Sequence, residues 1–147
     1  MNKLMQTTND WSAFILRLTL GIVIFPHGAQ KLLGWFGGGG FSGTMGFLTS
    51  AGIPSAIAFL IIMGESLGAV AIILGLMTRL CAASIAIIML GAIFLVHLKN
   101  GFFMNWMGQQ AGEGFEYHLL AIGICLALVI LGGGKFSVDK FLSSKSS

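Results

Sequence analysis

The sequence predicts an all-α integral membrane protein built as a four-helix bundle, and its composition and segment lengths support that prediction. Of 147 residues, 56% are hydrophobic and 9% are charged, whereas about 25% are charged in an ordinary soluble domain. Four apolar segments each approach the ~20 residues that a helix needs to cross ~30 Å of hydrocarbon. They are residues 13–33, 57–76, 80–98 and 115–131.

These segments are expected to be helices, because lipid offers the backbone no hydrogen-bond partners and strand-type alternation is absent. With their flanking residues, the helices are predicted at about 11–35, 55–76, 78–98 and 115–132. A single domain is expected to cover residues 1–147. A cleaved signal peptide is not expected, because Arg17 interrupts the first apolar segment.

The first helix and the segment after it carry recognisable boundary signals. Asn9 or Asp10 suits the N-cap, and Pro26 removes a backbone donor within the helix, which predicts a local kink. The run of four glycines at 37–40 is interpreted as a hinge, because the lysine and hydroxyl residue of a phosphate loop are missing. Residues 42–50 then predict a short helix that lies on, or re-enters, the outer leaflet.

The later helices follow from similar signals. Pro54 suits the first turn of the second helix. The turn before the third helix is tight, with Thr78 expected as N-cap, so these two helices should be antiparallel neighbours. Three glycines at 132–134 end the fourth helix, and residues 137–142 predict a short interfacial helix. Ser137-x-x-Lys140 formally matches a serine–lysine nucleophile motif, but no companion motif supports it.

The positive charges predict the orientation of the chain. The net charge of +3 is too small and too dispersed for a nucleic-acid surface. Five lysines and arginines fall on the side of the termini, and two, at the outer ends of apolar segments, fall on the other side. The five are Lys3, Arg79, Lys135, Lys140 and Lys145, and the two are Lys31 and Lys99. The positive-inside rule therefore predicts that both termini are cytoplasmic.

Ionisable residues within apolar segments are costly and mark candidate sites. Arg17, His27 and Lys31 share one face of the first helix, and Glu65 lies near mid-membrane on the second. An ion pair between Arg17 and Glu65 is expected, because the two differ in depth by roughly 8 Å. The remaining polar residues gather in the outer half, including His118, and the predicted ligand-binding set is His27, Lys31, Glu65, His97 and Glu116.

The nature of the ligand stays open between several chemistries. No metal site is predicted, because Glu116 and His118 are two residues apart and point to different faces of a helix, unlike a ferritin-type motif. Haem held between His27 and His97 remains geometrically possible. A lipid quinone fits more simply, because it enters from the bilayer and needs only a few donors within an apolar pocket. The cofactor therefore stays unknown at this stage.

An ordered set of motifs runs from about Trp11 to Leu142. It comprises Arg17-x3-Gly21, His27-Gly-Ala-Gln-Lys31, Gly43-Thr44, Gly52-Ile-Pro54, Glu65, Leu74-Gly-Leu-Met-Thr-Arg79, His97-x2-Asn-Gly101, Glu116-Tyr117 and Gly132 to Asp139. As a set, these motifs resemble the DoxX family of small bacterial membrane proteins. The resemblance implies a four-helix bundle in the inner membrane that does redox work, with quinone and with partner oxidoreductases, but it brings no agreed catalytic residues.

The leading hypothesis is therefore a redox-associated inner-membrane protein that binds a quinone or similar hydrophobic ligand in the outer half of the bundle. Whether it is itself an enzyme is open. The main alternative is a non-enzymatic anchor or assembly subunit, whose buried polar residues only hold helices together. A transporter is the third hypothesis and would need several copies to form a path, so a homo-oligomer is also considered.

Overall fold

The computed structural model describes residues 5–144, and all regular secondary structure in that part of the chain is helical, without a β-strand. Three of its helices are long and apolar enough to cross a membrane, namely Trp11–Leu33, Ser55–Leu74 and Thr78–Asn100. Glu116–Leu131 is a shorter apolar helix. The chain is thus an all-helical membrane protein, as its composition predicts.

Helix α1 (Trp11–Leu33) begins and ends at residues suited to those positions. The Asp10 side chain accepts a hydrogen bond from the Ala13 N–H at 2.8 Å, which confirms Asp10 as the N-cap. Asp10 lies just before the membrane-spanning helix, and this hydrogen bond lowers the pKa of its carboxyl. Gly34 ends the helix in the left-handed conformation, with φ 74°.

The segment after α1 forms two short helical pieces. The 3-10 turn η2 (Trp35–Gly37) leads into α2 (Gly40–Ser50), so the helix expected over 42–50 exists and begins two residues earlier. Helix α2 packs against α1 and α3, yet none of its residues is buried. It therefore covers the ends of those helices as a surface layer.

Helix α3 (Ser55–Leu74) and helix α4 (Thr78–Ala92) are joined by a tight turn, and the start of α4 corrects the expected cap. The N-cap position is Met77, and Thr78 is the first helical residue. The capping carboxylate comes from Asp139, which accepts from the Met77 N–H at 2.7 Å and the Thr78 N–H at 2.8 Å. The sequence could not show this, because the cap is 61 residues away.

Helix α4 continues into a π-helical turn, η3 (Ile93–His97), and a 3-10 turn, η4 (Leu98–Asn100). An irregular loop then leads to α5 (Glu116–Leu131), and the short helix α6 (Val138–Ser144) closes the described chain. α6 lies close to the residues predicted for a short terminal helix. π-Turns in helices are uncommon and recur at functional sites.

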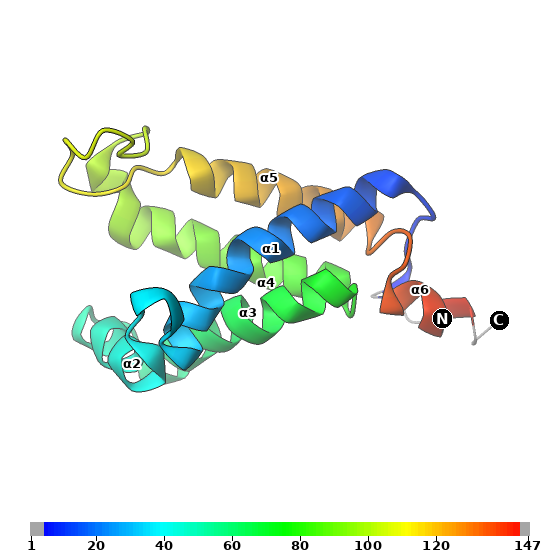
Figure 1. Ribbon diagram of the computed structural model, residues 1–147, viewed down its shortest axis with the longest axis horizontal. Helices are drawn as coiled ribbons and strands as arrows, with labels where there is room; N and C mark the ends of the chain where they lie inside the picture. Colours follow the sequence, from blue (N-terminus) through cyan, green and yellow to red (C-terminus); the bar gives the residue numbers. More distant parts are fainter. Residues whose placement is uncertain (1–4, 145–147) are drawn as a thin grey trace.

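Helices α1, α3, α4 and α5 associate in two pairs. α1 packs mainly along α3, and α4 packs mainly along α5, while α3–α4 and α1–α5 contacts join the pairs. Figure 1 shows the pairs close together near α6 and spreading apart towards α2 and the 101–115 loop. We call these the terminal end and the loop end. Lys3 and Lys145, which contributed to the predicted orientation, lie outside the described residues.

Small residues bring α1 and α3 into close contact. A Cβ atom on Gly28 would lie 2.2 Å from the Glu65 carbonyl oxygen, and one on Gly21 would lie 2.5 Å from the Ile73 side chain. The buried core between α1, α3, α4 and α5 is built mainly from aliphatic side chains, including Leu20, Ile24, Ile72, Ile85 and Leu128. The glycines therefore fix the crossing point of α1 and α3, and with it the depth at which their polar residues meet.

Candidate functional site

An ion pair between α1 and α3 forms the centre of the candidate site. Lys31 Nζ donates to Glu65 Oε2, with the Glu65 side chain 6% exposed and that of Lys31 28% exposed. The pair forms here because Gly28, one turn before Lys31, lies directly against the Glu65 backbone. A buried carboxylate needs such a partner to remain charged in an apolar surrounding. Glu65 and Lys31, both predicted site residues, are thus brought together.

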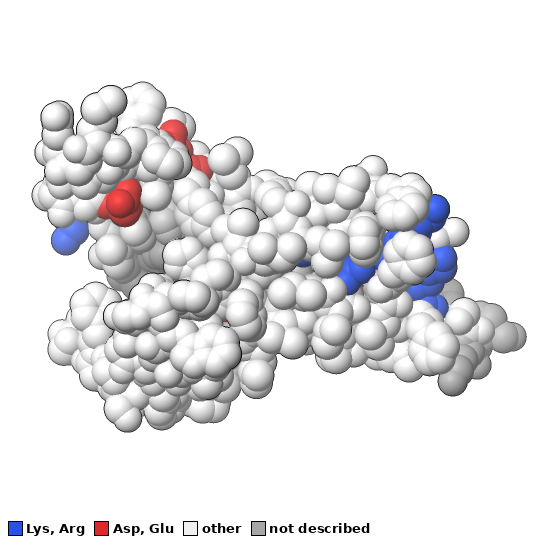
Figure 2. All heavy atoms as spheres, in the orientation of Figure 1, with Lys and Arg blue, Asp and Glu red and all other residues white. Residues whose placement is uncertain are grey.

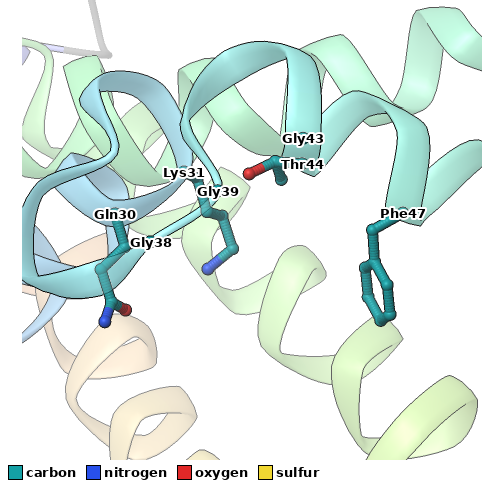
Figure 3. Close-up of a pocket in the computed structure, with 7 residues that line it drawn as sticks. All are labelled: Gln30, Lys31, Gly38, Gly39, Gly43, Thr44 and Phe47. Carbon is teal, nitrogen blue, oxygen red and sulfur yellow. The ribbon is translucent and has the colours of Figure 1, made fainter.

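Lys31 also lines a pocket under α2. The pocket has a volume of about 320 Å³, near the lower limit for small-molecule sites. Figure 3 shows its wall at the end of α1, the glycine-rich segment and α2, and the lining residues are Gln30, Lys31, Gly38, Gly39, Gly43, Thr44 and Phe47. Gly38 is required here, because a Cβ would lie 2.4 Å from the Gln30 carbonyl oxygen. The lining combines one ammonium group with small residues and a phenyl ring.

A connected set of four rings links α1 to α5 and η3. The His27 and Tyr117 ring centroids are 6.2 Å apart, Tyr117 and His118 are 5.3 Å apart, and His118 and His97 are 4.1 Å apart. His27 is exposed on the surface of α1, whereas His118 is only 6% exposed. His27 and His97 are thus linked through two other rings from α5. The structure places Tyr117 and His118 at the centre of this ring cluster.

Two polar atoms of the ring cluster are buried without a hydrogen-bond partner among the described residues. They are Tyr117 Oη and His118 Nδ1. Buried hydroxyl and imidazole groups normally find partners, because an unmet bond costs roughly 1–3 kcal/mol. Tyr117 Oη and His118 Nδ1 therefore have hydrogen-bonding capacity that a polar group of a ligand or an ordered water would satisfy. The sequence reasoning placed His118 in the outer half and Tyr117 in the family motif, but it assigned neither residue to the ligand-binding set. Their adjacency to Glu116 was the available signal.

His97 and Glu116 are occupied by contacts with the loop end. His97 Nδ1 hydrogen-bonds the Glu113 carbonyl oxygen at 2.8 Å, so Nδ1 carries the proton and donates. Glu116 Oε1 accepts from the Met104 N–H at 2.8 Å and from Trp106 Nε1 at 3.3 Å. Both residues therefore fasten the 101–115 loop. Figure 2 shows the surface hollowed between this loop and α2.

The expected Arg17–Glu65 ion pair is corrected by the structure. Arg17 is 1% exposed, and its guanidinium donates to backbone carbonyl oxygens at the terminal end. These belong to Ile72, Ile73, Gly133, Lys135 and Phe136. Two of the carbonyls are at the C-terminus of α3, where a cation is favoured by the helix dipole. Arg17 thus joins α1, α3 and the chain after α5, while Glu65 pairs with Lys31.

The described residues do not form a cluster of metal-ligating side chains. Within 5–144, no group of three or more His, Cys, Asp or Glu side chains lies close enough to hold a metal ion. The two cysteines, Cys81 and Cys125, are free thiols. The arrangement supplies instead an ammonium–carboxylate pair, a small pocket and two unpaired hydrogen-bonding atoms, which suits a neutral polar group on an apolar ligand.

Comparison with known proteins decides the family. The DoxX family model matches residues 12–98. The chain belongs to the DoxX family. A Bacillus subtilis (strain 168) protein named "Putative oxidoreductase CatD" is 34% identical over 139 residues, covering 94% of this chain and 92% of the relative. One relative of this DoxX-family chain is therefore named as an oxidoreductase.

Two further relatives are membrane proteins by name. The Escherichia coli (strain K12) inner membrane protein YqjF is 28% identical over 141 residues, which is 96% of this chain and 99% of the relative. An uncharacterized Mycobacterium tuberculosis (strain ATCC 25618 / H37Rv) membrane protein, Rv3486, is 28% identical over 153 residues, or 99% of this chain and 90% of the relative. No solved structure matches this DoxX-family chain.

Proposed function

We propose that this DoxX-family protein binds a quinone, or a similar small hydrophobic ligand, at the loop end and works with a partner oxidoreductase. The observation that carries the proposal is the pair of buried, unpartnered atoms Tyr117 Oη and His118 Nδ1 in the ring cluster. They lie on α5 opposite His27 of α1. The relative named as an oxidoreductase supports a redox setting.

A quinone suits these residues because its ring is apolar and its two carbonyl oxygens accept hydrogen bonds. The Tyr117 hydroxyl and a protonated His118 Nδ1 are possible donors to such an oxygen. Lys31 has ammonium protons beyond the one used by Glu65 and lines the neighbouring pocket. The ligand would reach the site through the surrounding lipid. When bound, a quinone supplies reversible two-electron, two-proton chemistry.

The five sequence-predicted residues take different parts in this proposal. His27 lies at the open side of the ring cluster, and the Lys31–Glu65 pair holds α1 and α3 together while leaving ammonium protons for a ligand. His97 and Glu116 form the outer wall by fixing the 101–115 loop. Tyr117 and His118 join them as the groups that hydrogen-bond the ligand. One buried ion pair would account for Lys31 and Glu65 alone, so the additional polar residues favour a ligand-binding site over a purely structural role.

The membrane arrangement belongs to the same proposal. We place α1, α3, α4 and α5 across the bacterial inner membrane as a four-helix bundle in a single domain, with both termini cytoplasmic. α5 has 16 residues, or about 24 Å of helix, and its flanks complete the span. Arg79, Lys135 and Lys140 all contact residues of the terminal end. The positive-inside rule therefore favours a cytoplasmic terminal end.

The experiment that tests the ligand begins with the intact protein purified in mild detergent. Its visible spectrum is recorded, and organic extracts are analysed for quinone. Binding of a short-chain ubiquinone or menaquinone is then titrated by tryptophan fluorescence. We expect co-purified quinone and saturable binding. A haem band instead would support axial ligation by histidine and would overturn the quinone proposal.

Tyr117→Phe is the sharpest variant, because it removes a hydroxyl that has no hydrogen-bond partner among residues 5–144 and keeps the ring. The loss of one hydrogen bond, about 0.5–1.5 kcal/mol, predicts quinone affinity roughly two- to tenfold weaker, with an unchanged or slightly higher melting temperature. Lys99→Gln is the control, since Lys99 is exposed and lies outside the pocket lining. Equal quinone affinity in wild type and Tyr117→Phe would contradict the proposed contact.

The alternative is an anchor or assembly subunit without a ligand of its own. It is favoured by the structural engagement of Arg17, His97 and Glu116, whose polar atoms bind backbone groups. Under this alternative, organic extracts of the intact protein would contain no quinone, and neither wild type nor Tyr117→Phe would show saturable quinone binding. Co-purification with a soluble oxidoreductase without any quinone would then be its positive signature.

A further inference from the structure

The terminal end carries an aromatic and basic surface that the proposed ligand site does not use. Trp11, Phe14 and Phe136 contact one another edge-on, with ring centroids 5.6–5.7 Å apart. Trp11 is 53% exposed and Phe136 is 73% exposed. Tryptophan and other amphipathic rings concentrate where the bilayer meets water. This cluster therefore places the start of α1 and the chain before α6 at the level of lipid headgroups.

Two lysines lie at the same level without an acidic partner among residues 5–144. Lys135 Nζ is 4.5 Å from the centroid of the Trp11 ring, and Lys140 Nζ donates to the Asn9 side-chain oxygen. Both partners are uncharged, so they orient the ammonium groups and leave their charge uncompensated. Figure 2 shows Lys and Arg residues gathered at this end of the molecule.

The nearby carboxylates of Asp10 and Asp139 already accept hydrogen bonds from backbone N–H groups at helix N-termini. Asp139 is 1% exposed and accepts the backbone N–H groups of Met77 and Thr78. Asp10 accepts the N–H of Ala13. Each carboxylate therefore offsets the positive end of a helix. The surface lysines remain available for an anion from outside the chain.

A pocket lies beside Lys140 on α6. Its volume is about 280 Å³, and it is lined by Phe136, Ser137, Lys140, Phe141 and Ser144. Ser137 and Lys140 are the pair that formally matches a serine–lysine nucleophile motif. Ser137 Oγ instead donates to the Gly134 carbonyl at 2.8 Å and accepts the Lys140 N–H at 3.2 Å, so it caps α6. Ser137 therefore has a structural role, and the Lys140 side chain is available to bind an anion in the pocket.

We propose that this pocket holds an anionic phospholipid of the surrounding leaflet. Its phosphate binds Lys140 Nζ, and its glycerol and first acyl carbons lie on the Phe136 and Phe141 rings. An amphipathic ligand suits a site with a cation beside two phenyl rings at headgroup level, and each lysine near an anionic surface contributes about 1 kcal/mol. The bound lipid would fasten α6, whose Asp139 caps α4, and would thereby strengthen the terminal end.

The test uses the full chain in mild detergent. Native mass spectrometry and melting temperature are measured with dioleoylphosphatidylglycerol and, separately, dioleoylphosphatidylcholine. We expect wild type to retain the anionic lipid and to bind it roughly fivefold more tightly than the zwitterionic one. Lys140→Gln should remove most of that preference, while Lys140→Arg should keep it. Lys99→Gln, at the loop end, is the matched charge control and should behave as wild type.

Three outcomes would overturn the proposal. The first is equal binding of the two lipids by wild type, and the second is an unchanged preference in Lys140→Gln. The third is a melting shift with inorganic phosphate alone that matches the lipid's, which would indicate an adventitious anion site only. The inference does not depend on the quinone proposal, because Tyr117→Phe should leave lipid preference intact.

Discussion

Replacing Gly28 with alanine should separate α1 from α3 and destabilise the protein. The added Cβ would lie 2.2 Å from the Glu65 carbonyl oxygen and 2.6 Å from Ser66 Cα, both backbone atoms that cannot rotate away. An ordinary carbon–oxygen contact is about 3.3 Å, so the helices would have to move apart by about 1 Å. Such overpacking costs roughly 2–3 kcal/mol. The same shift would pull Lys31 away from Glu65.

The measurement is thermal or denaturant unfolding in detergent, with Gly68→Ala as the matched control. Gly68 lies in α3, the helix that Gly28 of α1 contacts, but a Cβ on Gly68 would meet no atom within 4 Å. Alanine is the better helix former by about 1 kcal/mol, so Gly68→Ala should be neutral or stabilising. We expect Gly28→Ala to melt several degrees below wild type and Gly68→Ala to melt at or above it. Equal melting temperatures for the two variants would refute the close-packing argument.

Two further predictions concern the terminal end. Arg17→Met should lower the free energy of unfolding by about 3 kcal/mol or more, because it strands buried carbonyl oxygens, whereas Lys99→Gln should have little effect. A wild-type melting temperature for Arg17→Met would show that those hydrogen bonds contribute nothing. The Asp10 carboxyl has a pKa below its ordinary value of 3.8, because it accepts a hydrogen bond from the Ala13 N–H. The stabilisation that this carboxylate gives the folded protein is therefore complete above pH 3.8. It is lost as the pH falls through the lower pKa of the folded state. Melting temperatures measured across this acid range should therefore fall more steeply for wild type than for Asp10→Asn, and parallel curves would contradict the role of the charge.

The sequence by itself determined the class of the protein and most of its helices. Transfer of an apolar segment into lipid depends on that segment alone, so length and hydropathy were enough to predict the three long spans that the structure contains. Local backbone chemistry likewise predicted Asp10 as a cap and a short helix near 42–50. Each of these features is set by residues within one continuous segment of the chain.

Only the tertiary structure decided which cation pairs with Glu65. Arg17 and Lys31 share a face of α1, and depth along isolated helices suggested Arg17. The close contact at Gly28 fixes the crossing opposite Glu65, which leaves Lys31 about 4.5 Å further along the axis and Arg17 about 16 Å away. The crossing depends on side chains of two helices at once, so no single segment encodes it.

The same reason explains why sequence reasoning named two residues without identifying their roles. Asp139 caps a helix that begins 61 residues before it, and Tyr117 meets His27 across two helices. Their roles depend on how α5 and the chain after it return to α1 and α4. Periodicity and composition show that a polar residue is present within an apolar segment. The packing of the helices determines whether its polar atoms meet a backbone group, a counter-charge or a ligand.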